Sequence, residues 1–165
     1  MLLSDRTIRS LLDSGRLAIN PQPTEERLQP ASVDLTLGSG VQFPYGPSGV
    51  IPSRGFKIHP GMAVLFHTEE AVKLPADVAG RVEGKSTWGR QFLQVHSTAG
   101  FIDPGFHGQI VLEVVNLGPR PIQVHAGITI AQICFLQMDR DVARPYGSPG
   151  LGSKYQDQKG AVGAR

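Results

Sequence analysis

The chain has a single cysteine, Cys134, among 165 residues, so it cannot close a disulfide of its own. A fold that does without disulfides is typical of a reducing compartment, and we expect a cytoplasmic protein. The apolar neighbours of Cys134 in ITIAQICFLQ favour a buried thiol over a reactive one.

Charge is also scarce. Charged residues make up 18% of the chain, and the net charge is only +2. No basic stripe with interleaved aromatic residues is visible, which argues against a nucleic-acid partner, whereas a small anionic substrate is compatible with this balance. No apolar run approaches the ~20 residues of a membrane helix, and the first residues lack the apolar core of a signal peptide, so we expect no membrane partner.

Glycine and proline are plentiful, at 20 and 13 residues, as is typical of many short strands joined by tight turns. One clear helix pattern stands near the start, in SDRTIRSLLDSG. Ser4 can cap it, Ile8, Leu11 and Leu12 share one face, and Gly15 is the expected stop.

Alternating apolar residues predict an antiparallel β-barrel or sandwich in a single domain, residues 1–165. The segment 41–55 is expected to form a surface hairpin or loop, and residues 139–165 a mobile C-terminal lid without a core of its own. Strands are predicted within 32–38, 56–75 (two strands), 78–86, 92–98, 108–118 and 120–138 (two strands).

The stretch EGKSTWGR offers two cations and two hydroxyls beside glycines, a set that can cradle phosphate oxygens. Arg90 can grip an oxyanion through two parallel hydrogen bonds, and Lys85, Ser86 and Thr87 supply further donors. The upstream glycine of a P-loop is absent. A polar turn with a helical cap explains the same residues equally simply.

In TAGFIDPGF, Gly100 and Gly105 allow a tight turn and a close approach of the backbone to a ligand. Asp103 precedes a proline, which would hold its carboxylate rigidly. The alternative is an Asx turn in which this carboxylate only accepts local backbone hydrogen bonds.

In GQIVLEVVN, strand alternation places Glu113 on the same face as Val111 and Val115. Burial of a carboxyl among aliphatic neighbours favours its protonated form, which suits acid–base work near neutral pH. The alternative is a solvent-exposed face on which the valines are simply good strand formers.

The histidines give weaker signals. His59 and His125 precede turns and are expected to be structural, His67 and His107 to be exposed, and His96 to belong to a site or an interface. The chain lacks H-E-x-x-H, C-x-x-C and the H-x-E with P-C-x-x-C of zinc deaminases, and one cysteine cannot supply a zinc-binding pair. We therefore expect no zinc.

The C-terminal stretch GSKYQDQKGAVGAR is polar and basic. Such an arm could close over a bound polyphosphate and exclude water, or it could be a disordered terminus. Its candidate contact residues are Lys154, Tyr155, Gln158, Lys159 and Arg165.

Four stretches together resemble the dCTP deaminase family of the dUTPase superfamily: MLLSDRTIRSLLDSGRLAINP, PASVDLTLG, EGKSTWGRQFLQVHSTAGFIDPGFHGQIVLEVVN and GSKYQDQKGAV. The resemblance implies an all-β, dUTPase-like distorted β-barrel, assembled as a homotrimer with active sites between subunits. It also implies dCTP or dUTP as the nucleotide, Mg²⁺ held by the triphosphate rather than by protein ligands, and a deamination that uses no zinc.

By the same resemblance, Glu113 is the general base that takes a proton from a water attacking C4 of cytosine. Ser86 would lie near that water and the exocyclic nitrogen, and Arg90 would orient the glutamate. The implied substrate-binding positions are Lys85, Ser86 and Thr87 at the phosphates, Ala99 beside the attacked carbon, Asp103 and Phe106 at the sugar, Val111 in the same pocket, and Tyr146, Lys154 and Gln158 from the arm.

The sequence departs from the commoner family pattern G-R-S-S-L-A-R, which reads GKSTWGR here. Lys85 keeps the charge of an arginine but loses its bidentate fork, and Trp88 replaces a leucine. The chain is also short between Val41 and His59, where many relatives carry an insertion.

Four functions remain open. The first is dCTP deamination to dUTP and ammonia, in dUMP and dTTP supply. The second is a bifunctional form that also releases dUMP and diphosphate, for which HSTAGFID fits and Asp103 would activate the hydrolytic water. The third, a plain dUTPase, is opposed by Glu113. The last, a nucleotide-binding regulator without turnover, is opposed by Ser86 and Arg90 together with Glu113.

Overall fold

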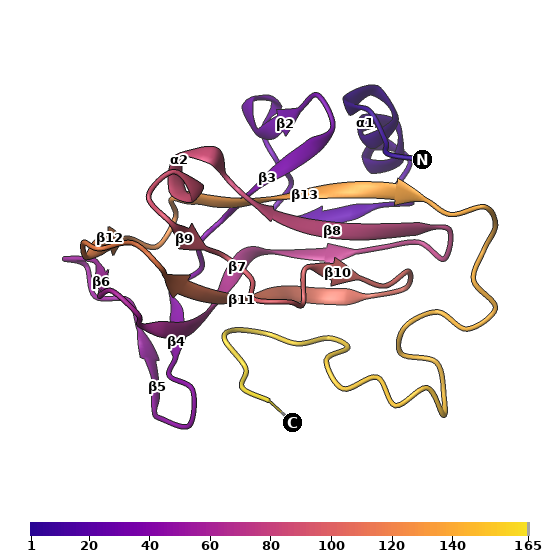
Figure 1. Cartoon of the computed structure of the whole chain (residues 1–165). Coiled ribbons are helices and arrows are strands. Elements are labelled where there is room, and N and C mark those ends of the chain that lie inside the picture. The colour runs from indigo at the N-terminus through magenta and orange to yellow at the C-terminus, as the bar shows by residue number, and fades with distance from the viewer. Residues whose placement is uncertain (165) are drawn as a thin grey trace.

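Short strands joined by tight turns make up most of the structure, a computed structural model that describes residues 1–164 (Figure 1). Because apolar side chains alternate along these strands, each sheet has a face that must be covered. The strands are β1 (Ala18–Asn20), β2 (Leu28–Gln29), β3 (Ser32–Thr36), β4 (Gly40–Gln42), β5 (Ser48–Val50), β6 (Phe56–Ile58), β7 (Ala63–Lys73), β8 (Val78–Gly84), β9 (Leu93–Gln94), β10 (Phe101–Ile102), β11 (His107–Asn116), β12 (Ile122–Val124) and β13 (Thr129–Gln137).

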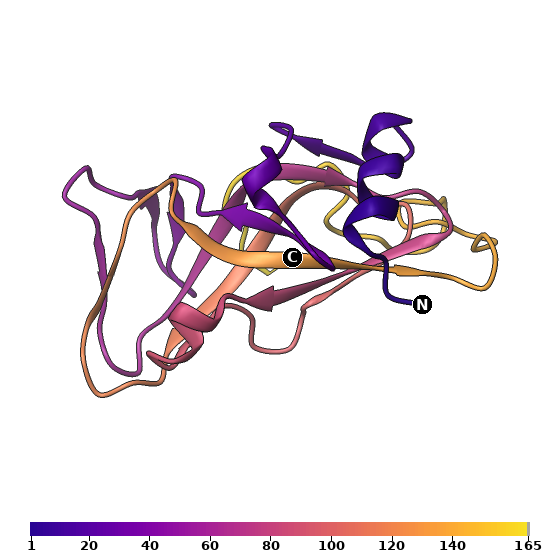
Figure 2. The same cartoon turned by 90° about the horizontal axis from the view of Figure 1, so that it is seen from above.

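The strands form two large antiparallel sheets that share one hydrophobic core. One sheet has the order β5-β4-β7-β11-β9, with β1 paired to β7, and the other has the order β10-β8-β13-β3-β2. A two-stranded ribbon of β6 and β12 lies at the end of the molecule opposite the N-terminal helix (Figure 2). Within residues 1–164 the sheets do not join into one closed cylinder. Two facing antiparallel sheets around one core are an open, distorted form of a barrel, so the expected all-β distorted barrel is confirmed.

The core lies between the two sheets, as expected when both contribute an apolar face. Both sheets contribute fully buried apolar side chains, among them Phe66 and Leu112 from one sheet and Phe135, Ile133, Ile130, Leu35 and Val33 from the other.

Helical structure is sparse, as expected. The predicted N-terminal helix is α1 (Asp5–Asp13), with Ile8 and Leu11 buried, and Gly15 follows its end at φ +70°. Two short helices were not predicted, η1 (Glu25–Arg27) and α2 (Ser86–Gly89). No helix of the described residues is long and apolar enough to cross a bilayer.

Three strand predictions need correction. Two strands do lie within 56–75, but the expected turn falls between β6 and β7 rather than before both. β9 covers only two residues of 92–98, and β10 was not foreseen. In β3 all five residues are buried, although alternation predicted a half-buried strand. The polar face of β3 is covered because its side chains find polar partners on neighbouring strands.

His67 is buried, with 6% of its surface exposed, so its expected exposure was wrong. Its Nε2 accepts a hydrogen bond from the Gly40 amide at 2.9 Å, and Nδ1 lies 2.8 Å from the Thr68 carbonyl. A Cβ at Gly38 would lie 2.1 Å from the ring. The imidazole fits in this place because the segment beside it has glycines where other residues would collide.

The C-terminal arm, from residue 139 onward, has no helix or strand within the described part and runs beside β11 (Figure 1). Gln158 and Gly108 form a parallel bridge, and the Gln109 amide donates to the Gln158 carbonyl at 3.0 Å. His107 Nδ1 lies 2.6 Å from Asp157 Oδ1. The expected mobility of this arm stays a prediction, and the candidate Arg165 lies outside the described residues.

Candidate active site

A pocket of about 300 Å³ opens where β10, β11 and the C-terminal arm meet. β10 and β11, from the middle of the sequence, line one side of it, and the C-terminal arm lines the other. Seven of the site residues expected from the sequence line it: Ala99, Asp103, Phe106, Val111, Glu113, Tyr146 and Gln158.

Glu113 is half-buried on β11, on the face that turns toward the pocket rather than the core. Its Oε2 accepts hydrogen bonds from the backbone amides of Ser97 at 2.9 Å and Thr98 at 3.3 Å. Within the described part of the chain, no group donates to Oε1. An ionised carboxylate is purely an acceptor, so the free oxygen is available to take a proton from a molecule in the pocket.

Gly100 lies in the loop between β9 and β10 whose amides hold Glu113. A Cβ there would lie 2.9 Å from the His96 ring and 3.0 Å from the Val82 carbonyl, so only glycine fits without displacement. His96 is half-buried, and its Nδ1 is the one buried side-chain polar atom without a hydrogen-bond partner among the described residues. The close packing of Gly100 against His96 and Val82 holds the loop in place, so that its amides reach Glu113.

The pocket has an aromatic wall. Phe106 is buried, and its ring centroid lies 5.8 Å from that of Tyr146 on the arm. The Tyr146 amide donates to the Pro104 carbonyl at 2.8 Å, which ties the arm to this wall, and the Tyr146 hydroxyl accepts from the Tyr155 amide at 3.1 Å within the arm. Asp103 is exposed at the rim, and the Phe106 amide donates to its carbonyl at 3.1 Å. A flat apolar ring beside a carboxylate suits a sugar.

A second pocket of about 460 Å³ adjoins the first and shares Asp103, Tyr146 and Tyr155 with it. Lys154 lines this second pocket, together with Arg144. The Asp103 carboxylate is common to both pockets, but Glu113 lines only the first, and the cationic side chains line only the second. A nucleotide with its base at Glu113 could direct its phosphates toward these cations.

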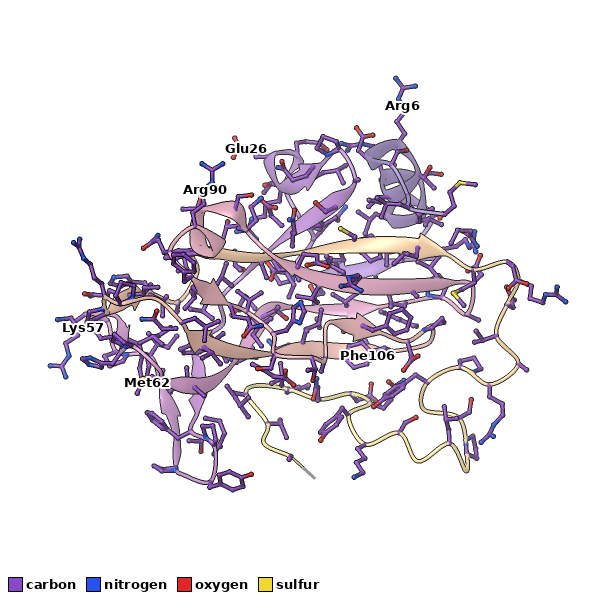
Figure 3. The ribbon with its side chains drawn as sticks, in the orientation of Figure 1. Arg6, Glu26, Lys57, Met62, Arg90 and Phe106 are labelled. Atoms are coloured by element: carbon purple, nitrogen blue, oxygen red, sulfur yellow. The ribbon has the colours of Figure 1, made fainter. Side chains whose placement is uncertain are left out.

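The remaining expected residues lie elsewhere. Ser86, Thr87 and Arg90 are exposed on and beside α2, and none of their side chains makes a hydrogen bond or ion pair with residues 1–164. Figure 3 shows Arg90 extending outward from the molecule, apart from Phe106. Lys85 Nζ instead donates to Asp34 Oδ1 at 2.6 Å. Within one chain, the structure does not bring Arg90 to Glu113.

Several pocket residues were missed by sequence reasoning. Leu65, Phe101, Ile102 and Ile110 contribute apolar walls, and residues 162–164 of the arm close one side. Strand alternation marked some of these side chains as apolar but gave no signal of which pocket they would line. Tyr155 was noted only as part of the arm.

Candidate metal ligands are dispersed. Among residues 1–164 no group of three or more His, Cys, Asp or Glu side chains lies close enough to hold a metal ion.

A sequence profile of the dCTP deaminase-like family matches residues 47–138, more than half of the chain. The chain belongs to this family. It is similar to the "dCTP deaminase, dUMP-forming" of Mycobacterium ulcerans (strain Agy99), with 44% identity over 182 aligned positions that cover 100% of this chain and 95% of that protein. It is also 41% identical to the protein of the same name from Thermobifida fusca (strain YX), covering 92% of it.

The alignments are longer than the 165 residues of the chain, so the relatives of this family carry residues that the present chain lacks. Among solved structures, the 2′-deoxycytidine 5′-triphosphate deaminase from Agrobacterium tumefaciens aligns with a TM-score of 0.65 and 28% identity. That match covers 81% of this chain and only 48% of the other, about half its length. The native EIAV dUTPase, at 24% identity and a TM-score of 0.57, shows the shared dUTPase fold.

Proposed function

We propose that the protein deaminates dCTP and, in the bifunctional form of the reaction, releases dUMP and diphosphate. The observation that carries the deamination is Glu113: it lines the pocket, its Oε2 is held by two amides, and its Oε1 has no donor among the described residues. Relatives at 41–45% identity bear the name "dCTP deaminase, dUMP-forming", which supports the second step.

Glu113 would act as a proton carrier. Its free oxygen takes a proton from a water molecule as that water attacks C4 of the cytosine, and the same carboxyl then returns the proton to the departing amine. The C4–O bond forms, the C4–N bond breaks, and ammonia leaves. Because Ser97 and Thr98 hold the other oxygen, the carboxylate needs little reorganisation during these steps.

Asp103 and Phe106 are proposed to bind the sugar, and Ala99 and Val111 to lie beside the base. For release of dUMP, a second water must attack the triphosphate, and Asp103 is the candidate that activates it because it lines both pockets. Lys154, Tyr146 and Gln158 would hold the triphosphate from the arm. Mg²⁺ would be carried by the triphosphate oxygens, where it supplies charge neutralisation.

We further propose a homotrimer whose sites take residues from two chains. Ser86, Thr87 and Arg90 do not line the pocket, and their side chains make no hydrogen bond or ion pair with residues 1–164, which supports their use by a neighbouring subunit. We expect the enzyme to work in the cytoplasm, since Cys134 is a free thiol.

The test is product identification. The protein is incubated with dCTP, and separately with dUTP, in the presence of Mg²⁺, and the nucleotides are separated by chromatography while ammonia is assayed. Ammonia and dUMP from dCTP support the full proposal, ammonia with dUTP limits it to deamination, and no ammonia overturns it.

Glu113→Gln should lower the rate of ammonia release by about 10³-fold or more, because the amide cannot accept the proton. The variant should still bind dCTP in equilibrium titration. Retention of wild-type turnover by Glu113→Gln would remove this residue from the mechanism.

A further inference from the structure

Two neighbouring side chains attach the turn that carries Ser86 and Arg90 to the sheet with the order β10-β8-β13-β3-β2. Lys85 Nζ donates to Asp34 Oδ1 on β3 at 2.6 Å, and Trp88 Nε1 donates to the Thr129 carbonyl on β13 at 2.8 Å. Lys85 is the extended residue just before α2, and its carbonyl accepts from the Trp88 amide at 3.0 Å, so the two residues are neighbours at the start of the turn. Their side of the turn faces the sheet, and both side chains are half-buried.

The other side of the same turn is presented to solvent. Ser86 and Arg90 are four residues apart and therefore share a face. The Arg90 amide donates to the Ser86 carbonyl at 3.0 Å, so the turn is helical over this spacing. The sequence thus alternates anchoring and presented residues within six positions.

Asp34 is the less exposed partner of the ion pair, with 12% of its side chain accessible against 26% for Lys85. A carboxylate this deeply placed is costly without a cation, so departure of Lys85 to a ligand would leave an uncompensated charge. A lysine ammonium has three donors, however, and Asp34 occupies one. Lys85 can therefore keep Asp34 and still donate to an anion outside.

We propose that Asp34 and Trp88 are positioning residues, which hold the 85–90 turn so that Ser86 and Arg90 are presented as a pre-formed pair and Lys85 is aimed at substrate phosphates. Asp34 acts through Lys85, and Trp88 acts through the turn itself. The substrate part of this inference rests on the proposed function; the fastening of the turn does not.

The fastening is tested by amide hydrogen exchange, which needs no substrate. The amides of Trp88, Gly89 and Arg90 donate within the turn and should be protected in the wild type. Asp34→Asn and Trp88→Phe should each accelerate their exchange by about 10-fold or more, because opening of the turn becomes easier. The control is Glu83→Gln, which breaks the exposed Arg81–Glu83 pair on the same strand and should leave these amides unchanged. Unchanged exchange in both test variants overturns the proposal.

Action through Lys85 is tested by a double-mutant cycle on the KM for dCTP. Asp34→Asn should raise KM by about 10-fold with kcat changed much less, whereas Glu83→Gln should leave both unchanged. In a Lys85→Met background, Asp34→Asn should add less than about 2-fold. A full additional 10-fold rise would show that Asp34 acts by another route. If the wild type releases no ammonia from dCTP, the proposed function fails, and hydrogen exchange still decides the fastening.

Discussion

At the scale of single residues, Glu113 owes its place to an irregularity in the strand beside it. The register of β11 against β7 changes between Gln109 and Val111, and β7 contributes two more residues than β11 to this interval. The Thr68 hydroxyl fills the gap: it accepts from the Ile110 amide at 2.9 Å and donates to the Glu70 carbonyl at 2.7 Å. One buried hydroxyl thus replaces a missing ladder bond just before the segment of β11 that carries Glu113.

Thr68→Val should therefore be strongly destabilising, although valine has nearly the same shape. The substitution leaves the Ile110 amide and the Glu70 carbonyl unpaired in a fully buried place, at a cost of about 2–4 kcal/mol. Denaturant unfolding measures this loss. Thr68→Ser keeps the hydroxyl and should lose less than about 1.5 kcal/mol. Equal losses for the two variants would show that the methyl group, not the hydroxyl, is the important part.

The surroundings of Cys134 on β13 set the pKa of its thiol. Burial raises the pKa of its thiol, nearby Glu83 raises it further, and Arg81 opposes both. A raised pKa leaves less thiolate at neutral pH, as expected for an unreactive thiol. Cys134 is only half-buried, however, so its expected full burial was wrong.

At the scale of elements, the loop between β7 and β8 joins distant parts of the chain through Asp77. The Gln137 side chain at the end of β13 donates to Asp77 Oδ2 at 3.1 Å, and Arg16 Nη2 donates to the same oxygen at 2.6 Å. The hydrogen bond from Gln137 is the largest cause that lowers the pKa of Asp77, burial opposes it, and Arg16 adds to the lowering.

A carboxyl with a lowered native pKa adds stability above its unfolded value of about 3.9, and this contribution is lost as pH falls through the native pKa. Asp77→Asn should therefore lower the Tm by about 1–4 °C at pH 7, and the difference from wild type should shrink below about pH 4. Thermal unfolding across this pH range measures it. Asp139→Asn, on an exposed carboxyl beside Arg140, serves as the control. A difference of the same size at pH 5 and at pH 3 would mean that charge is not the cause.

The elements themselves were largely predictable because alternation reports which residues must be covered. Alternation located β3, β8, β11 and β13, and the helical spacing of apolar residues located α1. What it could not give is the polar face of β3, whose partners lie far along the chain. The Ser32 hydroxyl donates to Gln132 Oε1 at 2.9 Å, and the Asp34 carboxylate accepts from Lys85 Nζ. The burial of His67 was missed for the same reason: Gly38 and Gly40, which lie against its ring, belong to a separate segment of the chain.

At the scale of the whole molecule, the expected site residues fall into two groups. One group lines the pocket between β11 and the arm, and the other projects from α2. Sequence resemblance named both groups because motifs carry roles from relative to relative. It could not state which chain supplies each group, since that depends on how subunits pack.

Mixed assemblies decide whether the two groups meet between chains. Glu113→Gln and Arg90→Ala should each be inactive alone, since each removes one half of every site. If a site takes Glu113 from one chain and Arg90 from the next, random co-assembly of the two variants at equal amounts should restore roughly one quarter of wild-type ammonia release, because half of the contributions of each kind are intact. The variants are mixed, unfolded and refolded together, and compared with each variant refolded alone. Absence of recovered activity from a mixture that assembles normally would place both groups in the same chain and contradict the shared site.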